Sequence, residues 1–445
     1  MYLLYSVATL IALVALSPYF LYQALRHKKY VGSLGQRLGY LPVALNLDSE
    51  PSIWIHAVSV GEVLSARPVI EELRKRYPSL RLFLSTTTRS GQQLARRSVT
   101  DVDGIFYFPF DWPFTVRRTL AIIQPKLFVM VENEIWPTML RECRRRGVKT
   151  MMMNGRISAR SFPRYRVIRP LFKRVLADID RFCVQGEETA GRLVALGADR
   201  SRMTLTGSLK FDALDETLPG RGPARVLRFF RMSPNRPVLI AGSTMRGEDE
   251  SVIRAFNRVR TTPAGANALL IIAARHPERF DDVERLCKSE GLATVRRSEL
   301  PIDAEPRCDA VILDTIGELA HLYQIATAVF VGGSLVPAGG HNILEPALYG
   351  KSIVFGPHME NFTEIAETFL TNRAAIQVHN ARELESTMVA LMGDPVRRAR
   401  LGAAARALID ANRGATDRTL AVIADLLPPQ ERSRTGTLHP FRLVH

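Results

Sequence analysis

The chain has 445 residues, of which 46% are hydrophobic and 23% are charged, so it is long enough for two domains that each bury a core. With 60 Lys and Arg against 44 Asp and Glu, its net charge is +16, which suits an anionic partner such as nucleic acid, anionic lipid or a phosphorylated substrate. Nucleic acid is disfavoured, because the sequence has no zinc-finger spacing, no ribonucleoprotein-type aromatic motif and no helix-turn-helix pattern.

The N-terminal segment is apolar. Residues 2–25 contain no Asp, Glu, Lys or Arg, and as a helix rising ~1.5 Å per residue they would span a ~30 Å hydrocarbon core. A signal peptide is disfavoured, because no basic residue precedes the segment and no small-residue cleavage site precedes the basic cluster at 26–29. That cluster predicts a cytoplasmic location for the rest of the chain. We therefore expect a membrane anchor at 1–28, and Pro18 and Gln23 leave a helix lying in the interface as an alternative.

After the anchor, apolar runs of strand length alternate with stretches of helical spacing. In the first half, a helix is predicted over 64–77, and strands are predicted at 52–58, 80–86, 104–108, 127–131, 149–153 and 181–184. In the second half, strands are predicted at 237–241, 268–273, 310–313, 328–331 and 352–355. Such alternation is typical of a parallel sheet with helices on both faces. The fold class is therefore α/β.

A stretch rich in Pro and Gly between residues 212 and 236 interrupts this alternation and gives the domain boundary. We expect two doubly wound, Rossmann-like halves that face a cleft, with ligands beyond the carboxyl ends of the strands. The expected organisation is an anchor, an acceptor-binding domain, a linker, a donor-binding domain and a flexible tail, at residues 1–28, 29–215, 216–235, 236–427 and 428–445.

Candidate catalytic groups of the first half follow its strands. Glu62 lies at a strand-to-helix corner, where a carboxylate can act as general base or can simply favour the helix dipole. Glu132 and Glu134 follow a very apolar strand; Glu132 ends it directly and is the better candidate, with capping or solvation as the alternative. Lys210 precedes the boundary and could reach a carboxylate or phosphate, although a solvated lysine is the simpler interpretation.

The second half contains a glycine-rich loop at 332–340 after an apolar strand, and a helix is expected to begin around Asn342. Glycines let a backbone approach a ligand closely, and N–H groups at a helix start bind anions. Glu345, one turn inside that helix, could accept hydrogen bonds from sugar or ribose hydroxyls. The loop, the helix start and this carboxylate together suit a nucleotide-sugar donor. Arg275 could bind phosphate, whereas His276 could cap or pack, and the glycine turn at 314–319 favours backbone contacts to a base or phosphate.

Several other chemistries are disfavoured by what the sequence lacks. The four cysteines are scattered and the histidines form no ligand-spaced pair, so reduced thiols and no metal site are expected. There is no Gly-Lys-Ser/Thr phosphate loop and no Gly-x-Ser-x-Gly elbow, which disfavours ATP hydrolysis and a serine nucleophile.

Taken in order, these motifs resemble those of the bacterial 3-deoxy-D-manno-octulosonic acid (Kdo) transferases of lipopolysaccharide synthesis. The resemblance extends from the anchor to about residue 425, and its motifs are HAVSVGE (56–62), ENEIWP (132–137), NGRIS (154–158), TGSLKFD (206–212), RHPERF (275–280), DTIGEL (314–319) and GGHNILE (339–345). The departures are small: Ala274 stands where proline is common, and Asn133 where threonine is common.

This resemblance implies a GT-B fold and inverting transfer of Kdo from CMP-Kdo to a phosphorylated lipid A precursor at the inner membrane, without a metal or another cofactor. It implies that Glu62 is the base and that Glu132 and Lys210 assist the transition state. The donor would be held by Arg275, His276, Ile316, Gly317, Glu318, Asn342, Ile343, Leu344 and Glu345. The basic surface then fits the phosphates of the acceptor and the anionic leaflet.

Two alternatives remain open at the level of sequence. One is a GT-B transferase or epimerase that acts on a UDP-sugar, which a comparison of CMP and UDP binding separates. The other is a membrane scaffold without catalysis, whose function would survive removal of the Glu62 carboxylate.

Overall fold

The computed structural model describes residues 33–158, 161–214, 227–233 and 235–427, together with five residues of the N-terminal segment: Tyr2, Tyr5, Thr9, Ile11 and Ala15. The expected tail at 428–445, most of the expected linker and most of the expected anchor therefore lie outside the described residues. Within the described part of the chain, no helix is both long enough and apolar enough to cross a bilayer.

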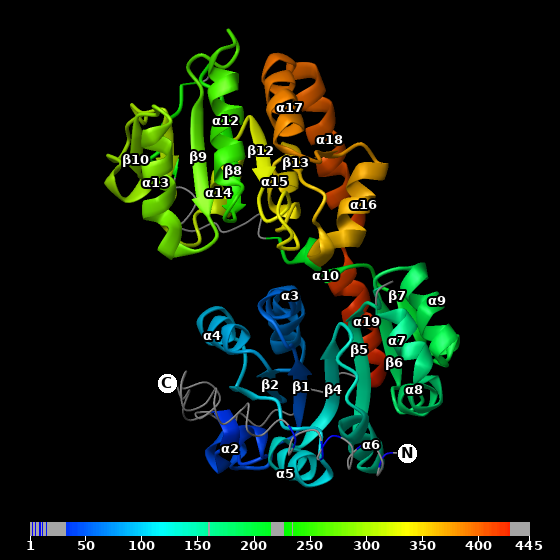
Figure 1. Ribbon diagram of the computed structural model, residues 1–445. Coiled ribbons are helices and arrows are strands. Elements are labelled where there is room, and N and C mark those ends of the chain that lie inside the picture. The colour runs from blue at the N-terminus through cyan, green and yellow to red at the C-terminus, as the bar shows by residue number, and fades with distance from the viewer. Residues whose placement is uncertain are drawn as a thin grey trace. The chain divides into compact units, whose positions relative to one another are not determined.

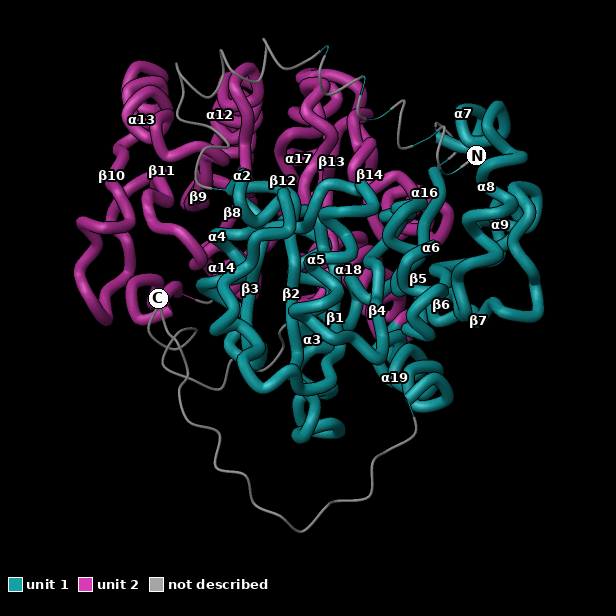
Figure 2. Tube along the Cα trace, turned by 90° about the horizontal axis from the view of Figure 1, so that it is seen from below, with its two compact units in different colours: residues 1–213, 413–445 teal, residues 214–412 magenta. Residues whose placement is uncertain are grey.

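The chain divides into two compact units (Figure 2). Unit 1 comprises residues 1–213 and 413–445, and unit 2 comprises residues 214–412. Each unit is built on its own seven-stranded parallel sheet with helices (Figure 1). Both doubly wound halves predicted from the sequence are confirmed, and the expected cleft between them stays a prediction.

The sheet of unit 1 has the order β3-β2-β1-β4-β5-β6-β7. Its strands are β1 (Ser52–His56), β2 (Arg81–Thr86), β3 (Gly104–Tyr107), β4 (Pro125–Val131), β5 (Lys149–Gly155), β6 (Arg181–Val184) and β7 (Met203–Leu205). Its helices are α2 (Leu34–Arg37), α3 (Val60–Arg76), α4 (Arg89–Ser98), α5 (Pro113–Ile123), α6 (Pro137–Arg145), α7 (Phe162–Val167), α8 (Arg169–Leu176), α9 (Glu187–Leu196), α10 (Leu209–Asp212) and α19 (Ala415–Leu426).

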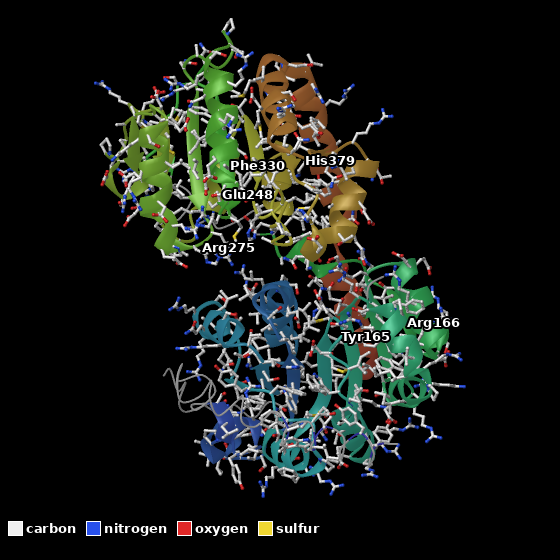
Figure 3. All side chains as sticks on the ribbon, in the orientation of Figure 1. Tyr165, Arg166, Glu248, Arg275, Phe330 and His379 are labelled. Atoms are coloured by element: carbon white, nitrogen blue, oxygen red, sulfur yellow. The ribbon has the colours of Figure 1, made fainter. Side chains whose placement is uncertain are left out.

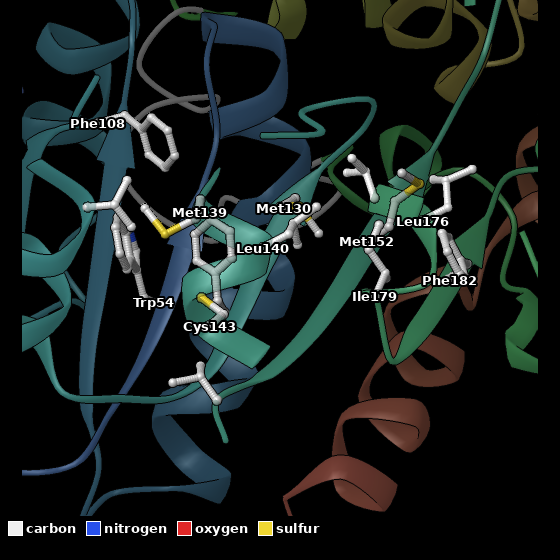
Figure 4. Packing of buried hydrophobic residues seen from close by; sticks show 14 of the residues in the cluster. Trp54, Phe108, Met130, Met139, Leu140, Cys143, Met152, Leu176, Ile179 and Phe182 are labelled. Atoms are coloured by element: carbon white, nitrogen blue, oxygen red, sulfur yellow. The ribbon is translucent and has the colours of Figure 1, made fainter. Parts of the chain in front are cut away.

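Alternation along β1 shows how this sheet buries both faces. Ile53 and Ile55 pack with residues of α3, α4 and α19, whereas Trp54 packs on the opposite face with residues of α5, α6 and α9. Figure 4 shows Trp54 among the buried side chains of its cluster, where Phe108 also lies. Burying a large apolar side chain stabilises a fold by roughly 1.5–3 kcal/mol, so both faces hold β1 in the centre. Its carboxyl end is thus a rigid support for the residues that follow.

The sheet of unit 2 has the order β10-β11-β9-β8-β12-β13-β14. Its strands are β8 (Val238–Thr244), β9 (Leu269–Ala274), β10 (Thr294–Arg296), β11 (Ala310–Ile312), β12 (Ala328–Val331), β13 (Ser352–Phe355) and β14 (Ile376–Gln377). Its helices are α12 (Asp249–Arg260), α13 (Phe280–Ser289), α14 (Leu319–Leu322), α15 (Leu344–Leu348), α16 (Thr363–Thr371), α17 (Ala381–Gly393) and α18 (Pro395–Asn412).

The C-terminal boundary of the second domain was predicted wrongly. We expected that domain to extend to residue 427, but α19 belongs to unit 1. Leu420 and Ile423 of α19 pack into the core of unit 1. The Asp212 carboxylate accepts hydrogen bonds from the backbone N–H groups of Gly414 (2.9 Å) and Thr416 (2.6 Å), which lie at the start of α19. The boundary therefore depends on contacts between residues more than two hundred positions apart in the sequence. Local sequence patterns cannot predict such contacts.

Candidate active site

Glu62 lies at the corner between β1 and α3. The helix begins at Val60, four residues before its predicted start, and this places Glu62 in the first turn. Its carboxylate accepts hydrogen bonds from the backbone N–H of Val58 (2.8 Å) and from the Ser59 hydroxyl (2.8 Å). Both bonds come from the corner itself, so they fix where the carboxylate lies.

The pKa of the Glu62 carboxyl lies near neutral pH. Burial raises its pKa to about 7, against the hydrogen bonds from Val58 and Ser59, and the negative charges of Glu132 and Glu134 raise it further. A general base works best when its pKa is near the operating pH, because it is then partly ionised and still basic enough to take a proton. The corner therefore provides a carboxylate suited to proton abstraction.

Glu132 and Lys210 form a half-buried ion pair. The Lys210 Nζ lies 3.7 Å from Glu132 Oε1, and the side chains are 19% and 18% exposed. Glu132 follows β4 with a φ of +58°, and its backbone N–H donates to the carbonyl of Met153 (2.8 Å). The left-handed conformation costs a non-glycine residue about 1–3 kcal/mol and is concentrated at functional sites. Lys210 is therefore paired with Glu132, whereas the simpler expectation from the sequence was a solvated lysine.

Sequence reasoning gave no role to Asn154, which holds Lys210 in place. Asn154 is fully buried near the carboxyl end of β5, again with a left-handed φ of +56°. Its Oδ1 accepts a hydrogen bond from the backbone N–H of Leu209 at the start of α10, the helix that carries Lys210 (3.0 Å). The signal in the sequence was that Asn154 begins the motif at 154–158. Its partner Leu209 is 55 residues away, so the sequence alone did not indicate the contact.

Glu134 is the second acid after β4, and its carboxylate lies near the rings of Trp136 and His56. Its Oε2 accepts a hydrogen bond from Trp136 Nε1 (3.1 Å) and lies 3.9 Å from His56 Nε2. Burial raises its pKa to about 7, and burial lowers the pKa of His56 to about 3. His56 Nδ1 lies 3.2 Å from the Ser85 carbonyl and 3.0 Å from the Ser85 hydroxyl, and His56 Nε2 has no hydrogen-bond partner among the described residues.

In unit 2, a cationic and histidine-rich group follows β9 and β12. Arg275 directly follows β9, and its backbone N–H donates to the carbonyl of Thr244 (3.0 Å). Burial lowers the pKa of His341 to about 4, and the nearby Arg275 and His276 lower it further. His341 Nε2 is buried and has no hydrogen-bond partner among the described residues. These three side chains can receive an anionic ligand.

Asn342 and Glu345 contact each other directly. Asn342 Nδ2 donates to Glu345 Oε1 (3.1 Å), and Asn342 Oδ1 accepts from the N–H of Leu344 (3.1 Å). The helix expected to begin around Asn342 begins at Leu344 and has five residues. Burial raises the pKa of Glu345. The side chains of Ile343 and Leu344 are fully buried, so only their backbone could meet a ligand.

The glycine turn after β11 divides into an open and a closed part. Ile316 is 87% exposed, and Gly317, with a φ of +89°, has open space where a side chain would project. In contrast, the Glu318 carboxylate accepts hydrogen bonds from Arg297 Nη2 (3.0 Å) and from the Thr315 hydroxyl (2.7 Å). Ile316 and Gly317 can therefore receive a flat group, whereas Glu318 is engaged within the unit.

One expectation about the glycine-rich loop is wrong. The sequence suggested that the backbone at 332–335 would approach a ligand, yet the N–H groups of Gly333, Ser334 and Leu335 all donate to the carboxylate of Glu248. The protein's own anion occupies these donors. Elsewhere, the four cysteines are buried thiols, and the described residues include no group of three or more His, Cys, Asp or Glu that could hold a metal ion.

Two parallel sheets whose candidate groups follow the carboxyl ends of the strands define the class of protein. The fold is similar to the UDP-GlcNAc 2-epimerase of Neisseria meningitidis bound to UDP-GlcNAc, with a TM-score of 0.58 at 11% identity over 84% of this chain and 100% of that one. It is also similar to a glycosyltransferase from Rickettsia africae, with a TM-score of 0.54 at 12% identity over 86% of this chain and 99% of that one. The protein therefore has the GT-B fold.

The relatives show the family within that fold. The family model described as 3-deoxy-D-manno-octulosonic-acid transferase (kdotransferase) matches residues 32–213. The 3-deoxy-D-manno-octulosonic acid transferase of Haemophilus influenzae is 33% identical over 91% of this chain and 93% of its own length. That of Bordetella pertussis is 34% identical over 84% of this chain and 87% of its own. The chain belongs to the Kdo transferase family, and it is a glycosyltransferase.

Proposed function

We propose that this protein transfers Kdo from CMP-Kdo to a lipid A precursor with inversion at the anomeric carbon. The observation that carries the proposal is the arrangement in unit 1, where a buried carboxylate with a pKa of about 7 neighbours an ion pair of Glu132 and Lys210. Membership of the Kdo transferase family supports the identity of the transferred sugar. In this proposal unit 1 binds the acceptor and unit 2 binds the donor.

The chemical step needs one base and a good leaving group. Glu62 takes the proton from a hydroxyl group of the acceptor sugar, and the hydroxyl oxygen forms a bond to the anomeric carbon of Kdo. At the same time the bond from that carbon to the phosphate oxygen of CMP breaks, and CMP leaves with the electron pair. The hydrogen bonds from Val58 and Ser59 hold the carboxylate in one orientation, which lowers the cost of reaching the transition state.

Lys210 and Glu132 assist this step electrostatically. A half-buried ammonium group stabilises nearby negative charge more strongly than a solvated one, because the surrounding dielectric is lower. Glu132 in turn keeps Lys210 in one position, at 3.7 Å. We assign the pair to the transition state, where charge moves from the base toward the phosphate.

In unit 2, the donor is bound through chemically matched groups. Arg275 and His276 meet the phosphate of CMP, together with His341, and Glu345 accepts hydrogen bonds from the ribose hydroxyls. Ile316 and Gly317 cover the base, which the exposure of Ile316 and the open space at Gly317 allow. Glu318 supports that turn through Arg297, and Asn342, Ile343 and Leu344 contribute backbone or amide contacts.

The proposal includes no metal ion, because Arg275 and Lys210 supply positive charge for the phosphate and the transition state. Activity should therefore persist in excess EDTA. The experiment that tests the whole proposal incubates the purified protein with lipid A precursor and either CMP-Kdo or a UDP-sugar, and product masses are read. A mass increase of Kdo with CMP-Kdo supports it, whereas transfer from a UDP-sugar alone contradicts it.

We also propose that residues 1–28 anchor the enzyme at the cytoplasmic face of the inner membrane. The support is the uncharged stretch 2–25 and the basic cluster behind it. Deleting residues 1–25 should release much of the protein from membranes and leave activity on detergent-dispersed acceptor. Binding that remains should weaken with salt, since anionic lipid would hold the basic surface. A folded truncated enzyme without activity on dispersed acceptor would contradict the anchor role.

A further inference from the structure

Glu248 is a fully buried carboxylate in unit 2, between β8 and α12. Figure 3 labels it together with Arg275, in the same unit. Its two oxygens accept four backbone N–H bonds: from Met245 (2.8 Å) and Gly333 (2.6 Å) at Oε2, and from Ser334 (2.9 Å) and Leu335 (2.9 Å) at Oε1. Three of these donors are consecutive residues of the glycine-rich loop after β12. No step of the proposed reaction uses this group.

Consecutive backbone N–H groups that point to one spot form an anion-binding nest, the type of site that holds phosphate in many proteins. Here the anion is a side chain of the same chain. A buried carboxylate is costly unless its oxygens are well hydrogen-bonded, and four donors at 2.6–2.9 Å meet that demand. Glu248 therefore fixes the loop in one shape.

The loop that Glu248 holds directly contacts the residues proposed to bind CMP-Kdo. The N–H of Gly340 donates to the carbonyl of Gly333 (2.7 Å), which closes the loop, and the N–H of His358 donates to the carbonyl of Ser334 (2.9 Å). The imidazole of His341 packs on Gly333: a Cβ added there would lie 2.9 Å from His341 Cδ2. Gly333 thus bonds to Glu248 on one side and supports His341 on the other.

We infer that Glu248 is a positioning residue for donor binding, which it serves by holding the loop that carries His341 and Asn342. The inference rests on the proposed function, because that proposal places the CMP phosphate and ribose at this segment. It also means that the donor phosphate does not bind the amides of residues 333–335. A carboxylate with only a structural role would lower stability when removed, but it would leave the balance between donor and acceptor affinity unchanged.

The test is Glu248→Gln in the full-length enzyme, since a side-chain NH2 would then face backbone N–H donors. We expect CMP affinity by calorimetry to fall about tenfold or more, as expected when binding groups lose their preorganisation. The Michaelis constant for CMP-Kdo should rise in parallel, and that for the acceptor should stay unchanged. Hydrogen exchange of the segment 332–341 should become faster.

The matched control is Asp111→Asn in unit 1. Asp111 is also a buried carboxylate that accepts backbone N–H bonds, from Thr138 (2.9 Å) and Met139 (2.8 Å) at the start of α6. It should lower the melting temperature without weakening CMP binding. If Glu248→Gln does not fold, Gly333→Ala leaves the carboxylate in place and displaces the His341 ring, and it should weaken CMP binding in the same direction.

Wild-type CMP affinity in a folded Glu248→Gln or Gly333→Ala variant would overturn the inference. Failure of the proposed function looks different: the wild-type enzyme itself would then bind UDP and not CMP. In that case the same variants are titrated with UDP, and unchanged UDP affinity would overturn the positioning role independently.

Discussion

Two strand-to-helix connections, β1–α3 in unit 1 and β12–α15 in unit 2, both lead to a glutamate in the first turn of a helix, but a carboxylate is used differently in each. Both contain glycine after an apolar strand and a glutamate in the first turn of the helix. At β1–α3, the hydrogen bonds that the Glu62 carboxylate accepts from described residues come from Val58 and Ser59 of the same connection. At β12–α15, backbone N–H groups of the loop donate hydrogen bonds to Glu248, which lies in the connection between β8 and α12. These N–H groups are therefore not available to a ligand.

The difference teaches that free amides at a strand end cannot be inferred from glycines alone. A glycine-rich loop shows that a backbone can approach an anion, and it does not show whether that anion is a substrate or a side chain. The two carboxylates differ in how many backbone N–H groups they accept hydrogen bonds from. Glu62 receives one and Glu248 receives four.

The variant Glu62→Gln gives the strongest test of the difference between the two carboxylates. If Glu62 is the base, turnover should fall by roughly 10²-fold or more, the usual scale for loss of general acid–base catalysis, with CMP affinity unchanged. Initial rates of product formation measure the loss. Glu71→Gln is the control, because Glu71 lies on the same helix and forms an ion pair with Arg67 (3.2 Å). Near-normal turnover in the Glu62 variant would assign both carboxylates to structure.

The pH profile sharpens the same point. Burial raises the pKa of Glu62 to about 7, and the base acts only when it is ionised. The ratio kcat/KM should therefore rise with pH by about tenfold per unit below pH 7 and level off above it. The residual rate of Glu62→Gln should lack this rise. A wild-type profile that is already flat at pH 5 would contradict the raised pKa.

Glu345→Ala probes the other connection. Removing an acceptor of ribose hydroxyl bonds should raise the Michaelis constant for CMP-Kdo by about tenfold, equivalent to one charge-assisted hydrogen bond, with little change for the acceptor. Calorimetry with CMP measures the same loss without turnover. If Glu345 only stabilises the helix start, CMP affinity stays constant and the melting temperature alone falls slightly.

Glu134, which lies near Glu132, gives a test of folding stability rather than of binding or turnover. Burial raises its pKa from 4.5 to about 7, so between these values the unfolded chain loses the proton and the folded protein keeps it. Stability from this group is complete below pH 4.5 and falls as the pH rises toward 7. Glu134→Gln cannot ionise and should gain up to ~3 kcal/mol relative to wild type across this range. Urea unfolding at pH 5 and pH 8 measures it, and an equal difference at both would contradict the buried acid.

Much of this molecule follows from local patterns. Apolar runs predicted the central strands of both sheets. Charged residues directly after strands made Glu132 and Arg275 candidates, and a strand-to-helix corner made Glu62 one. Short edge strands such as β7, β10 and β14 were missed, because two or three residues carry too little periodicity. Glu248 was missed for a different reason: its loop partners are 85 to 87 residues away, so only the folded chain brings them together.

The return of α19 to unit 1 has a consequence for synthesis of the chain. Unit 2 is in effect an insertion, since residues 214–412 emerge between the body of unit 1 and its last helix. At ~5–20 residues per second, translation leaves the partly built unit 1 waiting about 10–40 s for α19. During that time the surface that receives Leu420 and Ile423 stays uncovered. The nascent protein is therefore most vulnerable to aggregation after its first domain has been made and before its last helix has arrived.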